Sequence, residues 1–399
     1  MSLPDVATAL ERMLAKVAPL TAETVGVAGA DGRWLRNPVA AARDQPPFDA
    51  SAMDGWAVRS SDVERKACLT IVGESAAGRR ADMALGPGET VRIFTGAPLP
   101  AGADRVIMQE DAERRDATLI CGPATTASTH VRARGCDFRD GETLLTAGER
   151  LNPWRLALAA SAGAGDLVCG PSPKVAILAT GDELVEPGAV AGPDQIYNSG
   201  APSLGAFVAR HGGCALQLAS VGDSEAAIVA AVSGADFDLL VTIGGASVGD
   251  HDLVKPALKG QGAVLFVESV AVRPGKPVWF AILEDGRPVL GLPGNPASAL
   301  VCAELFLAPL MARLQGGTSE DRFETAVLAM DLPANGPRDH YIRAHAVAGP
   351  DGARLVTPFA NQDSSLVTIM AAANALIRRE PHAPAAVAGT VVQVLGPTL

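Results

Sequence analysis

The hydrophobic pattern between residues 173 and 315 alternates between two kinds of segment. Short apolar runs are typical of buried strands, and longer stretches with apolar residues at helical spacing are typical of helices. The runs lie at 175–179, 215–221, 239–243, 264–267 and 278–282, and the helical stretches lie at 199–212, 224–232 and 297–314. This alternation predicts a doubly wound, mostly parallel sheet with helices on both faces.

Polar residues at the starts of these helices have the chemistry of N-caps. Ser199 precedes the first helix and Asp223 the second. Asn295 followed by Pro296 is a helix-start signal, because asparagine accepts a backbone N–H and proline preorganises the first turn. Asp5 is expected to cap a further helix near the N-terminus, whose apolar residues share one face.

Outside this region the pattern changes to short strands separated by turns, which predicts small β domains. Strands are expected at 68–72, 90–94, 106–109 and 118–121, and again at 325–330, 341–347 and 391–395, while a helical pattern surrounds Trp154. The fold class is therefore a multidomain α/β plus β protein. We expect an extended N-terminal linker domain at 1–45 and 138–171, an inserted small β domain at 46–137, the doubly wound domain at 172–320 and a small β-barrel-like domain at 321–399.

Composition narrows the function classes. The net charge of −11, from 33 basic and 44 acidic residues, argues against non-specific nucleic-acid binding, and 4% aromatic residues make base stacking improbable. The six cysteines are dispersed without a C-x-x-C pair, which is typical of reduced residues in a cytosolic protein. The most apolar helical stretch, 298–314, carries Glu304 and is expected to be too short to span a bilayer. We expect a cytoplasmic protein without a membrane segment.

The stretch from Phe237 to Asp252 joins a buried strand to a glycine-rich turn. Three glycines in six residues let the backbone approach a ligand closely, and the N–H groups of such a turn bind phosphate. Carboxylates follow at once, at Asp250 and Asp252, and would repel phosphate unless a hard cation such as Mg²⁺ lies between them. The alternative is a strand that ends in a glycine-rich surface turn.

Several loops with polar residues follow the expected parallel strands. They lie at 180–183, at Asp223, at 244–252 and at 291–295. Because sheets of this kind bind ligands beyond the carboxyl ends of their strands, these loops are expected to form one site. Each acid in them could instead serve only as a helix cap.

The small β domain contains a second set of candidate residues. Asp54 lies in a short acidic loop, and Thr95 leaves a strand in a rigid turn. Arg132 and Arg134, two apart on one strand, share a face and could grip an oxyanion, or they could form a solvated edge that deters strand pairing.

The motifs FDASAMDGWAVR, RIFTGAPLPAGADRVIMQE, ATGDELVEPG, QIYNSG, GGASVGDHD, RPGKPVWF and GLPGNPASALV resemble, in this order, those of the MoeA family. These are the molybdopterin molybdenumtransferases, which are related to the C-terminal part of gephyrin. The resemblance covers essentially the whole chain. It implies an elongated homodimer of four-domain chains, in which the active cleft lies between the doubly wound domain of one subunit and the small β domain of the other.

The resemblance also implies the chemistry. Family members insert molybdenum from molybdate into adenylylated molybdopterin and release AMP. The motifs match at acids, a threonine and two prolines: Asp54, Asp137, Glu183, Asp223, Asp252, Thr95, Pro293 and Pro296. Lys276, helped by Arg273, is the expected oxyanion contact. The remaining expected substrate contacts are Gly244, Gly245, Ser247, Gly249, Gly294 and Asn295, and the expected Mg²⁺ ligands are Glu183, Asp250 and Asp252.

Two positions depart from the family pattern: Cys136 stands where an acid is usual, and 362–365 replaces a Gly-Ser-rich segment. Two other functions remain open. One is molybdopterin adenylyltransferase, whose family shares the doubly wound domain but lacks the segments around Asp54 and Thr95. The other is a non-catalytic scaffold, which would not need all five acids. A separate adenylyltransferase is a possible partner that supplies the substrate.

Overall fold

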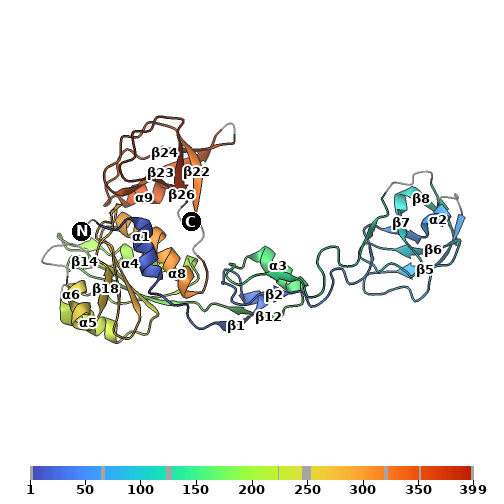
Figure 1. Ribbon diagram of the computed structural model, residues 1–399, viewed down its shortest axis with the longest axis horizontal. Helices are drawn as coiled ribbons and strands as arrows, with labels where there is room; N and C mark the ends of the chain where they lie inside the picture. The colour runs from blue at the N-terminus through green and yellow to red at the C-terminus, as the bar shows by residue number, and fades with distance from the viewer. Residues whose placement is uncertain are drawn as a thin grey trace.

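The computed structural model describes residues 3–63, 68–122, 128–222, 224–244, 253–318, 322–349 and 352–396. The molecule is elongated (Figure 1). The central α/β unit and the C-terminal β unit lie together at one end, the small β unit lies at the other end, and a narrow middle segment connects them.

The central unit is built on a six-stranded mixed sheet, ordered β16-β13-β17-β21-β20-β18. These strands are β13 (Lys174–Ala179), β16 (Cys214–Gln217), β17 (Leu239–Ile243), β18 (Val264–Val267), β20 (Trp279–Ile282) and β21 (Pro288–Leu292). The first four strands in this order pair in parallel. The last two pairings, β21 with β20 and β20 with β18, are antiparallel. The predicted doubly wound, mostly parallel sheet is therefore confirmed.

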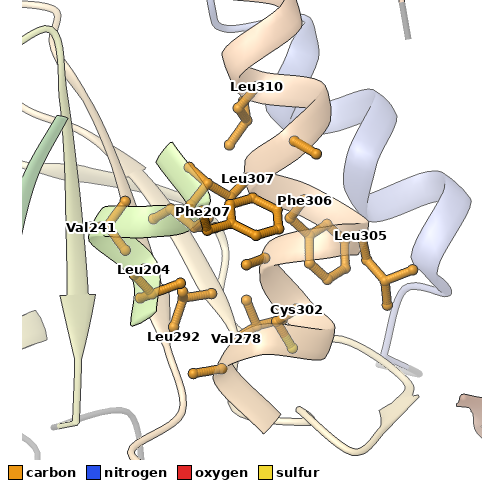
Figure 2. Close-up of a cluster of buried hydrophobic side chains, with 14 of the residues drawn as sticks. Leu204, Phe207, Val241, Val278, Leu292, Cys302, Leu305, Phe306, Leu307 and Leu310 are labelled. Atoms are coloured by element: carbon orange, nitrogen blue, oxygen red, sulfur yellow. The ribbon is translucent and has the colours of Figure 1, made fainter. Parts of the chain in front are cut away.

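Helices cover both faces of this sheet. They are α1 (Val6–Leu14), α4 (Gly200–Arg210), α5 (Glu225–Ser233), α6 (Val254–Gly260), and α7 (Pro296–Cys302), which continues through a π-helical segment (Ala303–Leu307) into α8 (Ala308–Leu314). On one face Val241 and Leu292 pack with Phe207 of α4 and Phe306 of the long helix (Figure 2). On the other face Leu240 and its neighbours pack with α5 and α6. Successive residues of a strand point to opposite faces of the sheet, and both faces are covered by helices. Every residue of the strand is therefore buried, which explains the continuous apolar runs.

The long helix from Pro296 to Leu314 has the length and composition of a membrane span, with a mean hydropathy of 1.6, but 78% of its most apolar window is buried inside the protein. The expectation that it is too short to span a bilayer is therefore wrong. Its apolar character is explained by burial in the core of the central unit. Glu304, buried on this helix, forms an ion pair with Arg322.

The small β unit is a six-stranded sheet ordered β7-β4-β6-β5-β9-β8. Its elements are β4 (Gly55–Val58), α2 (Ser60–Val63), β5 (Cys68–Ser75), β6 (Glu89–Ile93), β7 (Arg105–Met108), the 3-10 turn Gln109–Asp111, β8 (Ala112–Arg115) and β9 (Thr118–Cys121). The pair β3 (Ala50–Ser51) and β10 (Val131–Arg132) closes the unit where the chain enters and leaves.

Two antiparallel pairs form the middle segment, because the outgoing and returning chains run side by side. They are β1 (Glu23–Gly26) with β12 (Asp166–Cys169), and β2 (Val39–Ala40) with β11 (Thr143–Leu145). The 3-10 turn Val27–Gly29 and α3 (Pro153–Ser161) pack beside them. Trp154 of α3 does not belong to a core, since 86% of it is exposed.

The C-terminal unit is a closed small β-barrel ordered β19-β23-β24-β22-β26-β25, in which β23 also pairs with β25. Its elements are β22 (Phe323–Leu328), β23 (Asp339–Ala348), β24 (Arg354–Pro358), α9 (Val367–Ala372), β25 (Ala375–Arg379) and β26 (Val391–Leu395). The strand β19 (Val272–Arg273) reaches it from the central unit and pairs with β23. The central and C-terminal units are therefore joined by strand pairing.

The predicted helix caps are only partly correct. Asp5 accepts a hydrogen bond from the Thr8 N–H, as predicted. The side chain of Ser199 makes no cap at α4, because Asn198 one residue earlier accepts from the Ala201 N–H instead. Ser224 caps α5, and the predicted cap Asp223 lies outside the described residues. Asn295 begins α7 without a side-chain cap.

Gly291→Ala should destabilise the central unit. A Cβ at this position would lie 1.9 Å from Nε1 of Trp279, which is fully buried. Overpacking of this kind lowers the free energy of unfolding by about 1–3 kcal/mol. Urea unfolding followed by circular dichroism measures the change. Gly260→Ala is the matched control, because a Cβ there meets nothing within 4 Å. Since Gly260 ends α6 and alanine has the higher helix propensity, its midpoint should equal or exceed that of wild type. Equal midpoints for both variants would contradict the close contact between Trp279 and Gly291.

Candidate active site

The carboxyl ends of three parallel strands meet at one edge of the central sheet. The Thr180 N–H after β13 donates to the Ile243 carbonyl at 3.0 Å, and the Gly244 N–H after β17 donates to the Leu292 carbonyl of β21 at 3.3 Å. Three of the predicted loops therefore start side by side, as expected from the sheet topology. The segment after β16 joins them through a bridge between Val221 and Thr180.

Glycine is required where the Gly244 turn begins. Its φ of +92° is in the left-handed region, and a Cβ would lie 2.5 Å from the Thr180 carbonyl oxygen. Gly294 lies against the same turn, since a Cβ there would be 3.5 Å from the Gly244 Cα. The hydroxyl of Thr180 is buried without a hydrogen-bond partner among the described residues. The edge is therefore a close-packed backbone platform.

Part of the predicted site lies outside the described residues. These residues are Gly245, Ser247, Gly249, Asp250, Asp252 and Asp223. Among the residues that the structure describes, no group of three or more His, Cys, Asp or Glu side chains could hold a metal ion. Any Mg²⁺ site at this edge would therefore need carboxylates from the stretch after Gly244.

Glu183 is exposed in the loop after β13, and its carboxylate folds back over Gly181. A Cβ on Gly181 would lie 2.5 Å from a Glu183 oxygen. Asp182 lies on the other side of this loop, with Oδ1 2.5 Å from where a Cβ of Gly222 would be. The loop therefore presents two carboxylates at the sheet edge. Hard cations prefer such oxygen ligands.

In the small β unit, Asp54 and Thr95 form a direct pair. Oδ1 of Asp54 accepts from both the backbone N–H and the hydroxyl of Thr95, each at 2.7 Å. These hydrogen bonds, aided by Arg92, lower the pKa of Asp54. The sequence singled out both residues but did not predict this contact. Asp54 is thus held ionised on an exposed surface.

The other candidates in this unit are engaged differently. Arg134 forms an ion pair with Asp44 at 2.5 Å, and its N–H donates to Asp49. Asp44 can therefore compete with any oxyanion for the Arg134 guanidinium. Asp137 is exposed, and its backbone N–H donates to the Gln45 carbonyl.

The candidate residues fall into two groups that lie at opposite ends of the elongated molecule. Asp54, Thr95 and Asp137 belong to the small β unit, while Glu183 and Gly244 belong to the central unit (Figure 1). A single chain does not bring the two groups together.

The two predicted cations lie at the end of β19 and in the loop that follows it, since Arg273 is the last residue of β19 and Lys276 lies between β19 and β20. Lys276 is exposed, and its carbonyl accepts from the Val270 N–H at 3.0 Å. Gly275 has a φ of +112°, and a Cβ on it would lie 2.2 Å from Sγ of the fully buried Cys302. Arg273 lies in register with His340 of β23. The predicted oxyanion contacts therefore lie where the central unit meets the C-terminal unit.

Further cationic residues at this junction were missed in the sequence. A cavity of about 570 Å³ is lined by Arg273, His340, Gln362 and Arg379, among others. Arg343 is only 1% exposed, and neither terminal nitrogen of its guanidinium has a partner among the described residues. No local sequence signal marks these residues, because strand pairing assembles them.

The departing segment 362–365 also belongs to this junction. Gln362 accepts from the backbone N–H of Arg343 at 2.9 Å, and the Asn295 side-chain amide donates to the Ser364 hydroxyl at 3.0 Å. Asn295 therefore joins the start of α7 to the C-terminal unit instead of capping its own helix.

Comparisons with known proteins cover nearly the whole chain. Residues 4–163 match the MoeA N-terminal region (domain I and II), residues 176–313 a probable molybdopterin binding domain, and residues 325–396 the MoeA C-terminal region (domain IV). The chain belongs to the MoeA family. The order of the three regions matches the order of the motifs that carry the resemblance.

Individual relatives agree with this assignment. The chain is 36% identical to the molybdopterin molybdenumtransferase of Nostoc sp. over 80% of this chain and 76% of the relative. It is 33% identical to molybdopterin molybdenumtransferase 2 of Mycobacterium tuberculosis over 93% of this chain and 94% of the relative. The crystal structure of the molybdopterin biosynthesis MoeA protein from Pyrococcus horikoshii is similar with a TM-score of 0.81, at 28% identity and 99% coverage of both chains.

Thr95→Val should move the acid limb of the pH–rate profile to higher pH. The Thr95 hydroxyl is the largest cause of the lowered pKa of Asp54, so its removal returns that pKa towards the ordinary range. If turnover needs ionised Asp54, activity is then lost at a higher pH than in wild type. Thr118→Val, on β9 of the same sheet and outside the candidate site, is the matched control. An unmoved acid limb in Thr95→Val would mean that Asp54 ionisation does not limit turnover.

Proposed function

We propose that this chain, a transferase of molybdenum cofactor biosynthesis, inserts molybdenum from molybdate into adenylylated molybdopterin and releases AMP. The observation that carries the proposal is the pair of half-sites. One combines the three strand ends with Glu183, and the other is the hydrogen-bonded pair of Asp54 and Thr95. Both lie on motifs of the family.

The enzyme works as a homodimer in this proposal, with each active cleft built from two subunits. The separation of the half-sites along one elongated chain supports this arrangement. Trp154 on α3 of the middle segment is 86% exposed. An exposed aromatic side chain is of the kind enriched at subunit interfaces. The domain boundaries at 46–137, 138–171, 172–320 and 321–399 are part of the same proposal, as is a cytoplasmic location.

The pterin nucleotide is proposed to bind at the sheet edge that begins with Gly244. Its phosphates would be bound by backbone N–H groups of the turn containing Gly245, Ser247 and Gly249. The second wall would be the segment Pro293, Gly294, Asn295 and Pro296. The close approach of Gly294 to Gly244 supports this two-sided arrangement.

Mg²⁺ is proposed to be held by Glu183 with Asp250 and Asp252, and Asp223 is the remaining acid of this edge. The chemistry of the donors fits, because Glu183 presents oxygen ligands at the sheet edge and Mg²⁺ takes one or two carboxylates plus phosphate oxygens. When bound, this ion would act as a Lewis acid on the phosphoanhydride. Glu183 would orient the phosphate group, and Asp54 of the second subunit, held ionised by Thr95, would accept a proton or a hydrogen bond at the cleft. Asp137 would lie at the rim of that second half-site.

Molybdate is proposed to enter where the central unit meets the C-terminal unit. Arg273 and Lys276 lie on either side of Gly275, the residue that packs closely on Cys302. Arg343 is a buried guanidinium without a carboxylate partner among the described residues. A tetrahedral dianion would supply that partner. Guanidinium groups suit oxyanions because they donate several hydrogen bonds in a fixed fork.

Complementation between two inactive variants tests the shared site. Asp54→Ala and Glu183→Ala should each abolish AMP release and cofactor formation while leaving the dimer intact, because each removes one half-site. Mixed dimers contain one cleft without either change. Random reassociation makes half of the dimers mixed with one working cleft each, so activity should recover to about one quarter of wild type.

The measurement is AMP release from adenylylated molybdopterin with molybdate and Mg²⁺, with sedimentation to verify the dimer. The control mixes Asp54→Ala with the double variant Asp54→Ala/Thr95→Ala, which alter the same half-site and should not recover activity. Absence of recovery in the first mixture would show that both half-sites act within one chain. Wild-type turnover in either single variant would remove that residue from the site.

Removal of divalent ions tests the metal assignment separately. Chelation followed by gel filtration should stop AMP release, because the proposed carboxylates and phosphate would then repel one another. Readdition of Mg²⁺ should restore it, and Na⁺ at equal ionic strength should not. Full turnover in metal-free buffer would contradict a Mg²⁺-dependent mechanism.

A further inference from the structure

Three basic side chains stand in a row across adjacent strands of the C-terminal unit. Arg273 of β19 is in register with His340 of β23, and His340 is in register with Arg379 of β25. Residues in register on neighbouring strands point to the same face of a sheet. All three line the cavity of about 570 Å³. The row therefore presents two guanidinium groups and one imidazole to a single space.

The charges around His340 are mostly positive. Arg379 is only 7% exposed, and its Nε has no partner among the described residues. The other charged groups facing His340 or lining its cavity are Arg338, Arg343, Asp331 and Asp363. Both carboxylates are already engaged: Asp331 accepts from the Ala388 N–H, and Asp363 from the N–H and hydroxyl of Ser365. The lining itself carries two arginines and two carboxylates, while four arginines in all act on His340: Arg273, Arg338, Arg343 and Arg379.

This environment disfavours a charged imidazole. Burial, together with Arg273 and the other arginines, lowers the pKa of His340 to about 4. The imidazole is therefore neutral near pH 7. An anion in the cavity would reverse the local field, because an opposite charge nearby favours the protonated form.

We propose that His340 takes up a proton from solvent when a tetrahedral oxyanion enters this cavity, so that molybdate binds as the dianion together with one proton. The inference rests on the proposed function, in which molybdate is the oxyanion handled at this junction. No bond to molybdenum forms or breaks. The proton moves from water to an imidazole nitrogen, and the imidazolium donates to a molybdate oxygen. His340 is then a binding residue for the substrate.

Calorimetric titration with molybdate between pH 6 and 8, in buffers of different ionisation enthalpy, counts the protons taken up. In this range molybdate is the monomeric dianion. Wild type should take up close to one proton per molybdate at the lower pH. A one-proton linkage also weakens binding by up to about tenfold per pH unit as the pH rises. Affinity falls with rising pH for this reason: His340 is neutral in the empty site, so molybdate binding must take up a proton, and protons are scarcer at higher pH.

His340→Gln should bind molybdate without proton uptake and with little dependence on pH, because the amide cannot be protonated in this range. His345→Gln is the matched control, since His345 is an exposed histidine on the same strand outside the cavity lining. It should keep the uptake and pH dependence of wild type. Thermal unfolding verifies that both variants fold. If His340→Gln does not fold, the number of protons that wild type takes up per molybdate tests the proposal instead.

Different failures separate this inference from the proposed function. Molybdate binding by wild type without proton uptake, or equal uptake by His340→Gln, would overturn the role of His340 and leave the shared active site standing. Absence of molybdate binding at every pH would overturn the inference together with the proposed oxyanion entry at this junction. Complementation between the Asp54 and Glu183 variants tests the shared site independently of either result.

Discussion

The close approach of backbone to backbone at the carboxyl edge of the central sheet governs the rest of the site. Gly244 lies so near the Thr180 carbonyl that a Cβ would be 2.5 Å from its oxygen, and Gly294 lies against the same turn. Three strand ends can therefore converge without side chains between them. A platform of this kind exposes N–H groups and leaves room for phosphate. The buried strands below it fix its geometry, because their residues pack on both faces.

The second constraint is the distance between the half-sites. Two antiparallel strand pairs, β1–β12 and β2–β11, tie the outgoing and returning chains together in the middle segment. The small β unit is thus carried on a paired arm, far from the central unit of its own chain (Figure 1). In the proposed function, a cleft that needs both units is completed by a second subunit. Under that proposal, subunit pairing and catalysis are one requirement, and the acids on two distant surfaces of one chain belong to clefts shared with a second chain.

The sequence predicted the central unit well because local pattern and tertiary burial agree there. Strands of a covered parallel sheet are apolar on both faces, so β13, β17 and β21 are recognisable without knowing their partners. The pattern correctly predicted a helix around Trp154, but it did not indicate that this side chain is exposed. It also gave the wrong capping residue at α4, because Asn198 and Ser199 have the same capping chemistry and only the backbone geometry distinguishes them.

The site was predicted to the extent that its residues follow strand ends. Gly244 and Pro293 come directly after strands and Glu183 lies in the loop after β13, and the topology then brings these loops to one edge. The bond between Asp54 and Thr95 joins residues 41 apart, and both were singled out without a reason to pair them. No local sequence pattern indicated that Arg343 and Arg379 belong to a binding site. Their hydrogen-bond partners lie in loops distant in the sequence, and a charged residue inside a strand of a small domain usually indicates a solvated face.

Burial of these arginines links the electrostatics of the chain to its substrate. The net charge is −11, so the average field repels anions. A few deeply placed cations must therefore attract them locally. A buried guanidinium without a paired carboxylate carries a desolvation penalty of several kcal/mol. At Arg343 the hydrogen bond from Nε to Gln362 and the nearby Asp363 offset only part of it, since neither terminal nitrogen has a partner among the described residues. Under the proposed function, an incoming dianion would offset that penalty directly and would also favour protonation of His340. In the proposed function, the same charges that destabilise the empty junction would give the bound oxyanion its affinity, and the C-terminal unit would be part of the substrate-binding site.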